Sequence, residues 1–207
     1  MRIPFTFFSL FVIFALWTIY EIHKSKSQQQ RKNDEFWEKE RAANDVRRKP
    51  VNNLPYIIIT NEIIPDITTD DNQILTLINQ LSAMKELKIL NLSGKTNTDL
   101  KMEYGPANLP FLTECDNNFI NFCRVTNALG KTLADNNYIS EAIQIYEFAI
   151  WSGSDVSSSY SELANLYLQT NRREDIKKLI TQAETLDSLL KESIISKLND
   201  CYEASHN

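Results

Sequence analysis

An apolar run at the N-terminal end, over residues 3–22, constrains this chain more than any other feature. Its first charged residue is Glu21, and a helix of about 20 apolar residues is long enough to cross the roughly 30 Å hydrocarbon core of a bilayer. The run lacks the small-x-small pattern of a cleavage site and ends in Trp17 and Tyr20, which suit a membrane interface; a cleaved signal peptide is the alternative. We therefore expect a transmembrane anchor over residues 1–22 that contacts the lipid bilayer.

Charge is distributed unevenly along the chain. Residues 1–50 hold 10 of the 22 Lys/Arg and 6 of the 27 Asp/Glu, so the remainder is acidic. Lys24, Lys26 and Arg31 follow the apolar run closely, and the positive-inside rule then predicts a cytoplasmic location for the C-terminal part. An extracytoplasmic location is the alternative, because a very short N-terminal tail often stays inside. We expect a single-pass protein of the cell membrane that does not bind nucleic acid, since an acidic domain repels phosphate backbones.

Two further segments separate the anchor from the C-terminal part. Residues 23–50 are polar and predict a solvated helical stalk that ends before Pro50. In residues 51–118, the β-branched run 56–60 and the apolar run 89–92 flank a stretch with helical apolar spacing. This order predicts a small strand-helix-strand unit with parallel strands, which serves as an accessory α/β segment.

Helical apolar spacing continues from residue 119 to 207, so the fold class that we expect is mainly α. Breaks near Asn136, Gly153 and Asn171 divide this region into short antiparallel helices. Segments 123–156 and 157–190 also align with each other, which gives a repeat interval of about 34 residues. The small and large residues that align between the two copies predict paired helices in close contact. These residues are Leu129, Gly130, Leu133, Ala142, Tyr146 and Ala149 in the first copy, and Tyr160, Leu163, Ala164, Tyr167 and Ala183 in the second.

On these positions the chain resembles the tetratricopeptide repeat (TPR) family, over about a third of its length. Thr126 replaces the first aromatic residue of copy one, Ile176 replaces a small residue of copy two, and neither copy ends in proline. The resemblance implies an array of α-hairpins, with the final helix capping its open end. A generic pair of helical hairpins is the alternative. Segments 40–44, 54–56 and 90–94 are also similar to segments of bacterial membrane-anchored repeat proteins.

The resemblance implies a groove that receives a peptide or a helix of a partner protein. By their position within the repeats, the candidate groove residues are Arg124, Asn127, Lys131, Asn165 and Gln169. Their amides and cations are suited to bind a peptide backbone or a carboxylate, although each is also a common solvated surface residue. We expect an adaptor or scaffold for protein-protein interaction. A non-catalytic structural subunit or spacer of a membrane complex is the alternative.

Catalysis is not favoured by the residues available. The only histidines are His23 and His206, so the chain cannot assemble a histidine-based triad or a zinc site with convergent ligands. A hydrolase that uses the acidic pairs at 70–71 or at Glu114 and Asp116 is a remote alternative, because capping and solvation explain these pairs more simply. We expect no enzyme activity, no cofactor and no metal.

The remaining motifs have plain structural interpretations. Ser93–Thr96 is similar to the end of a phosphate-binding loop, but Ile89 stands where that loop needs a glycine, so an ordinary turn is expected. Cys115, Cys123 and Cys201 form no CxxC pair and predict buried thiols. A disulfide between Cys115 and Cys123 is the alternative.

Overall fold

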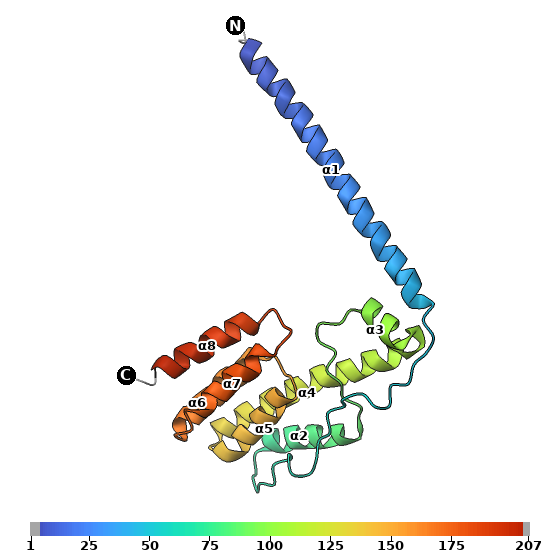
Figure 1. Ribbon diagram of the computed structural model, residues 1–207. Coiled ribbons are helices and arrows are strands. Elements are labelled where there is room, and N and C mark those ends of the chain that lie inside the picture. The colour runs from blue at the N-terminus through green and yellow to red at the C-terminus, as the bar shows by residue number, and fades with distance from the viewer. Residues whose placement is uncertain (1–4, 205–207) are drawn as a thin grey trace. The chain divides into compact units, whose positions relative to one another are not determined.

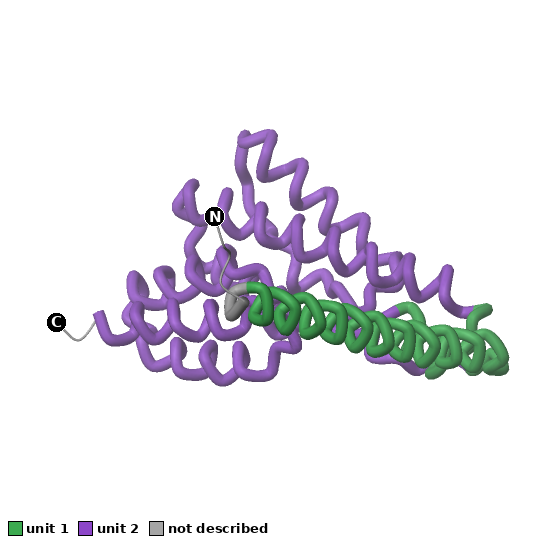
Figure 2. The backbone as a smooth tube through the Cα atoms, turned by 90° about the horizontal axis from the view of Figure 1, so that it is seen from above, with its two compact units in different colours: residues 1–49, 97–107 green, residues 50–96, 108–207 purple. Residues whose placement is uncertain are grey.

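The computed structural model describes residues 5–204 and is mainly helical (Figure 1). The helices are α1 (Phe5–Asn44), α2 (Asn72–Ala83), η1 (Met84–Glu86), α3 (Asn97–Tyr104), η2 (Pro106–Asn108), α4 (Leu109–Asp135), α5 (Ile139–Trp151), α6 (Ser157–Gln169), α7 (Asp175–Glu184) and α8 (Lys191–Ala204). The chain forms two compact units, which Figure 2 distinguishes by colour: unit 1 comprises residues 1–49 and 97–107, and unit 2 comprises residues 50–96 and 108–207.

Unit 1 consists of α1 and the short helix α3, which packs against the C-terminal end of α1. Glu40 of α1 accepts a hydrogen bond from the hydroxyl of Thr98 at 2.7 Å and forms an ion pair with Lys101. The neighbouring Ala43 is fully buried. The Lys101 ammonium holds the pKa of Glu40 below its ordinary value, because it stabilises the charged carboxylate.

The predicted transmembrane anchor is not supported. Across the part of the chain that the structure describes, no helix combines the length and the apolar character needed to cross a membrane. Residues 3 and 4 of the predicted span lie outside the described residues. From Phe5 onward the apolar run is the first part of one 40-residue helix, which continues without a break past Glu21 into the polar residues that we had expected to form a separate stalk.

The predicted strand-helix-strand unit is also wrong in its strands. Its helix is present as α2, but within residues 5–204 the two apolar runs form only one isolated antiparallel bridge, between Ile57 and Ile89. The backbone N–H of Leu90 donates to the Cys115 carbonyl, and that of Leu92 donates to the Asp116 carboxylate, both on α4. Because α4 takes these donors, one edge of the second run is not available to a neighbouring strand.

The core of unit 2 is built around α4. Helices α2, α5 and α6 all contact α4, and it presents fully buried residues such as Phe122, Val125 and Leu129 to them. The extended segments that contain Ile59 and Ile89 add to the same core. The acidic side chain of Asp71 caps α2 by accepting hydrogen bonds from the backbone N–H groups of residues 73 and 74 at 2.7 and 3.2 Å.

From α4 to α8, the helices and their ends recur at the repeat interval that the sequence predicts. Helix α4 is followed by Asn137 with φ 65°, and α6 by Asn171 with φ 58°. The same backbone bonds close both helices: the N–H of Tyr138 donates to Leu133 O at 2.9 Å, and the N–H of residue 172 donates to residue 167 O at 2.7 Å. Asparagine tolerates this left-handed conformation better than most residues. Helix α8 likewise begins one repeat interval after the start of α6.

The eleven repeat positions are all buried in this helical, repeat-like array, with exposed fractions of 0–1% for those in the core cluster. The two residues that replace others in the repeat pattern are both accommodated. Thr126 is fully buried, and its hydroxyl donates to the Phe122 carbonyl at 2.8 Å. Ile176 packs into the same core. Helix α8 contacts α6 and α7, and it buries Ile194 and Leu198 there.

Gly130 and Tyr146 set the distance between α4 and α5. A Cβ at Gly130 would lie 2.7–2.9 Å from three ring atoms of Tyr146, so the absence of a side chain lets the ring pack directly on the backbone of α4. The ring is fully buried. At the equivalent positions of the second copy, alanine (Ala164) replaces the glycine and the smaller Ile180 replaces the tyrosine.

We expect Gly130→Ala to destabilise the protein. Alanine gains roughly 1 kcal/mol of helix propensity over glycine, but overpacking a rigid core costs about 1–3 kcal/mol. We therefore expect a net loss of about 1 kcal/mol in the free energy of unfolding, measured by urea denaturation followed by circular dichroism. The matched control is the same substitution in a Tyr146→Leu background, where the cost should shrink. An equal cost in both backgrounds would mean that the tyrosine ring is not what excludes a side chain at this position.

Candidate functional site

A cavity of about 650 Å³ opens beside the first half of α4 in unit 2. Its size lies within the range of sites that bind small molecules or single peptide side chains. Three segments line it: the loop before α3, one face of α4, and the connection between α5 and α6. The lining residues are Leu92, Ser93, Gly94, Lys95, Asp116, Phe119, Ile120, Cys123, Arg124, Asn127, Asp155 and Val156.

Helix α4 supplies the apolar part of the cavity. Phe119 and Cys123, one turn apart, are buried with exposed fractions of 4% and 7%. Ile120 lies beside them and is 60% exposed. An isoleucine this exposed, on a helix whose other sides are buried in the core, marks a surface where apolar contact is still available.

Hydrogen bonds hold the loop wall of the cavity in place. The side chain of Asn91 donates to the Gly153 carbonyl at 3.1 Å and accepts from the backbone N–H of Ser93 at 2.9 Å. The N–H of Lys95 donates to the Leu92 carbonyl at 3.1 Å. These bonds form the turn that we expected at residues 93–96. Gly94 has φ +81°, and a side chain there would collide with the Asp187 carboxylate, so the turn needs glycine.

The connection between α5 and α6 forms the third wall. It begins at Gly153, whose φ of 90° requires the left-handed conformation. The following Ser154 is fully buried, and its carbonyl accepts a hydrogen bond from the Tyr160 hydroxyl at 3.1 Å. The carboxylate of Asp155 accepts a hydrogen bond from Ser188 at 2.6 Å. The wall is therefore fixed from both sides, and Asp155 stands at the rim.

Two of the five predicted groove residues, Arg124 and Asn127, line this cavity. Arg124 is exposed and donates one hydrogen bond to Asn121 at 2.6 Å. The side-chain oxygen of Asn127 accepts hydrogen bonds from Ser158 and Ser159, both at 2.9 Å. Asn127 thus also connects α4 with the first turn of α6, a structural role that its position in the sequence did not indicate.

The other three predicted residues do not line the cavity. Lys131 is exposed on α4, one turn beyond Asn127. Asn165 is exposed on α6 and accepts a weak hydrogen bond from the thiol of Cys201 on α8, at 3.9 Å. Gln169 is the last residue of α6 and is exposed. Whether these three bind a partner stays a prediction.

The cavity carries charges of both signs around its apolar floor. Asp116 and Asp155 are acidic, and Lys95 and Arg124 are basic. Asp116, which we had considered as a candidate acid, accepts the hydrogen bond from the backbone of residue 92 at 3.3 Å. Within residues 5–204, no three histidine, cysteine or acidic side chains gather in a way that could hold a metal ion. The cavity can therefore bind a ligand through apolar contact, hydrogen bonds and ion pairs.

All three cysteines are free, and Cys115 and Cys123 are buried as predicted. Burial raises the pKa of the Cys123 thiol to about 11, and a hydrogen bond with Ser154 offsets part of that rise. Burial raises the pKa of Cys115 and of Cys201 as well. Because the thiolate is the reactive form, these thiols are poor nucleophiles at neutral pH.

Most of the cavity was missed by sequence reasoning. Ile120 could have been found, because it lies one turn before Arg124 and two turns before Asn127 and so shares their face of the helix. The loop 92–95 and Asp155 could not, since nothing in their local sequence indicates that they meet α4. Comparison with known proteins adds no relative: no family model, no curated protein and no solved structure matches this chain.

We expect Cys123 to resist alkylation in the folded protein. At pH 8, a pKa of about 11 leaves about one thiol in a thousand ionised, against about a quarter for an ordinary cysteine. Labelling of the full chain with iodoacetamide, followed by peptide mass spectrometry, should therefore modify Cys123 on the order of a hundredfold more slowly than the same cysteine in urea. Cys201, which is only half-buried, is the internal comparison and should react first. Equal rates for both cysteines would contradict the burial of Cys123.

Proposed function

We propose that this protein is a non-catalytic adaptor of the tetratricopeptide type, which binds a partner protein through the cavity beside α4. The observation that carries the proposal is the exposed Ile120 above a buried apolar floor, with polar and charged groups around the rim. Interfaces commonly combine an apolar centre with a polar rim in this way. The ends of α4 and α6, and the starts of α6 and α8, are each one repeat interval apart, which supports the assignment to this type of repeat.

The nature of the cavity supports binding rather than catalysis. Its acidic side chains accept hydrogen bonds from neighbouring groups, Asp116 from a backbone N–H and Asp155 from Ser188. Its thiol has a raised pKa and is mostly protonated at neutral pH. A binding site needs only shape, apolar contact and oriented polar groups, and the cavity has all three.

A spacer is the second candidate, and α1 favours it. Forty residues of continuous helix span about 60 Å. The polar part of α1 carries an exposed aromatic pair, Phe36 and Trp37, whose rings are 5.4 Å apart in an edge-to-face arrangement. If the protein works as a spacer, its contacts with a partner lie along α1 and not at the cavity.

Photo-crosslinking separates these two functions. A photoreactive phenylalanine analogue replaces Ile120 in one version of the chain, Trp37 in a second and the fully exposed Leu189 in a third. We expect a discrete crosslinked product in cells from position 120 and none from position 189. Substituting Arg124→Gln and Lys131→Gln together should weaken that product, while the control Lys178→Gln, an exposed cation on α7, should not. A product from position 37 alone would favour the spacer and contradict the adaptor.

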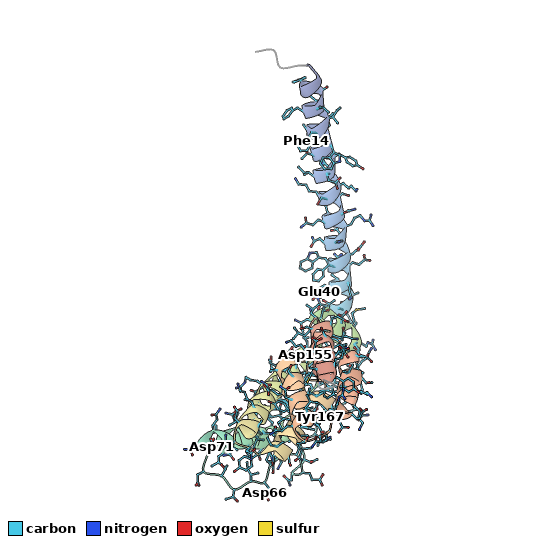
Figure 3. All side chains as sticks on the ribbon, turned by 90° about the vertical axis from the view of Figure 1, so that its left-hand side faces the viewer. Phe14, Glu40, Asp66, Asp71, Asp155 and Tyr167 are labelled. Carbon is cyan, nitrogen blue, oxygen red and sulfur yellow. The ribbon has the colours of Figure 1, made fainter. Side chains whose placement is uncertain are left out.

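We also propose that the apolar part of α1 contacts lipid, at the cell membrane. Its large side chains are exposed on every side of the helix, with exposed fractions of 68% for Phe11, 61% for Phe14 and 58% for Trp17. Figure 3 shows side chains around Phe14 projecting from α1 in all directions. Exposed apolar surface of this extent marks contact with a protein or a membrane, and the basic residues that follow it favour the membrane. Lys24 and Lys26, just beyond, suit anionic head groups. The cytoplasmic location of unit 2 stays a prediction.

Flotation with liposomes tests the lipid contact. The full chain should float with vesicles that contain anionic lipid, because burying the apolar side chains of this segment in lipid is favourable. Substituting Phe11, Phe14 and Leu16 with serine should abolish flotation. The matched control replaces Phe36 and Trp37 with serine, since these exposed aromatic residues lie about 20 Å or more further along the helix. Unchanged flotation of the first variant would refute the lipid contact.

A further inference from the structure

The residues on the cavity-facing side of α4 follow one another in a definite order of chemical type. Asp116, Ile120, Arg124 and Asn127 follow one another at intervals of four, four and three residues, and all of them line the cavity. Residues at this spacing lie on one side of a helix. Along the axis, the side therefore runs from an acid through an exposed apolar residue to a cation and an amide. Lys131 continues the same side by one more turn.

The amide of Asn127 is oriented by its neighbours. Its oxygen accepts hydrogen bonds from the hydroxyls of Ser158 and Ser159. Since the oxygen and the nitrogen are separate groups of the planar amide, these two bonds do not use its N–H donors. The amide is held by its bonds to α6, so it can donate to a ligand without losing further side-chain freedom.

Arg124 adds a cation one turn away. A hydrogen bond from one terminal nitrogen to Asn121 occupies part of its guanidinium, and the group has five N–H donors in all. A guanidinium with donors to spare binds a carboxylate through charge-assisted hydrogen bonds, which are stronger than neutral ones. The C-terminal half of this helix side therefore favours an acceptor that carries negative charge.

We propose that the occupant of the cavity is an extended peptide segment of a partner protein, with an Asp or Glu two positions from a large apolar residue. The apolar side chain packs on Ile120, and the carboxylate binds Arg124 and the amide of Asn127. The spacing follows from geometry. One helical turn of four residues separates Ile120 from Arg124 by about 6 Å along the axis, and two residues of extended peptide span about 6.6 Å.

This inference rests on the proposed adaptor function and adds the chemistry of the ligand. A partner helix would bring its side chains to the cavity at intervals of three or four residues, and a lipid would show no dependence on a carboxylate at a fixed position. The test therefore varies the spacing. An array of ten-residue peptides, blocked at both ends, carries one Leu or Phe and one Glu at separations of one to five residues, in both orders, on a Gly/Ser background.

Binding of the full chain, kept in detergent micelles, is measured by fluorescence anisotropy. We expect the tightest binding at a separation of two, with a loss of about tenfold when the Glu is replaced by Gln, as for a charge-assisted hydrogen bond. Arg124→Gln should weaken binding of the Glu peptide by a similar factor and leave binding of the Gln peptide unchanged. Ile120→Ser should weaken binding of both peptides. Lys178→Gln is the matched control for charge and should change the binding of neither peptide.

Three outcomes would overturn the motif: equal binding at all separations, tighter binding when Lys replaces Glu, or no effect of Arg124→Gln. The crosslinking experiment distinguishes these from a failure of the adaptor function. A crosslinked product from position 120 together with a flat peptide profile would retain the adaptor and reject this ligand. No product from position 120 would reject both, because the cavity would then have no protein partner.

Discussion

The packing of α4 between α2 and α5 is the constraint on which the rest of unit 2 depends. At Gly130 the tyrosine ring of α5 lies directly on the helix backbone, so α5 packs closely against α4. The connection from α5 to α6 then carries Asp155 and Val156 to the cavity. The loop 92–95 reaches the same place because α4 binds its backbone through Asp116. One helix thus organises both the core and the site.

The helices of the C-terminal part were predictable because their signals are local. Asn137, Gly153 and Asn171 stand at helix ends and take positive φ values, a conformation that glycine and asparagine tolerate better than other residues. The burial of residues such as Tyr146 and Tyr167 follows from the alignment of the two repeat copies. The strands could not be judged in the same way. Residues 56–60 and 89–92 have the composition of strands, but they meet only in the bridge between residues 57 and 89. The backbone N–H groups of residues 90 and 92 donate instead to α4, which is distant in sequence.

The same distinction between local and long-range signals applies to the site. Arg124 and Asn127 were found from their place in the repeat, since a position on a helix face is encoded locally. The remainder of the cavity is made by contacts between distant segments, such as the bond from Asn91 to Gly153, for which the sequence has no periodic signal. The anchor prediction is a separate case. It rested on the apolar composition of one run, and within residues 5–204 no helix has the length and apolar character needed to cross a membrane.

Exposed apolar residues occur in two arrangements in this protein, and they call for two kinds of contact. In α1, consecutive large side chains from Leu10 to Phe14 are exposed all around the helix, so any surface that covers them has to be the same on every side. On α4, Ile120 is exposed between charged neighbours and above a buried floor. A uniform apolar medium would leave the charges of Asp116 and Arg124 without a charged partner, which costs free energy. A ligand with its own ordered charges would not, and for that reason we propose a peptide for the cavity and lipid for α1.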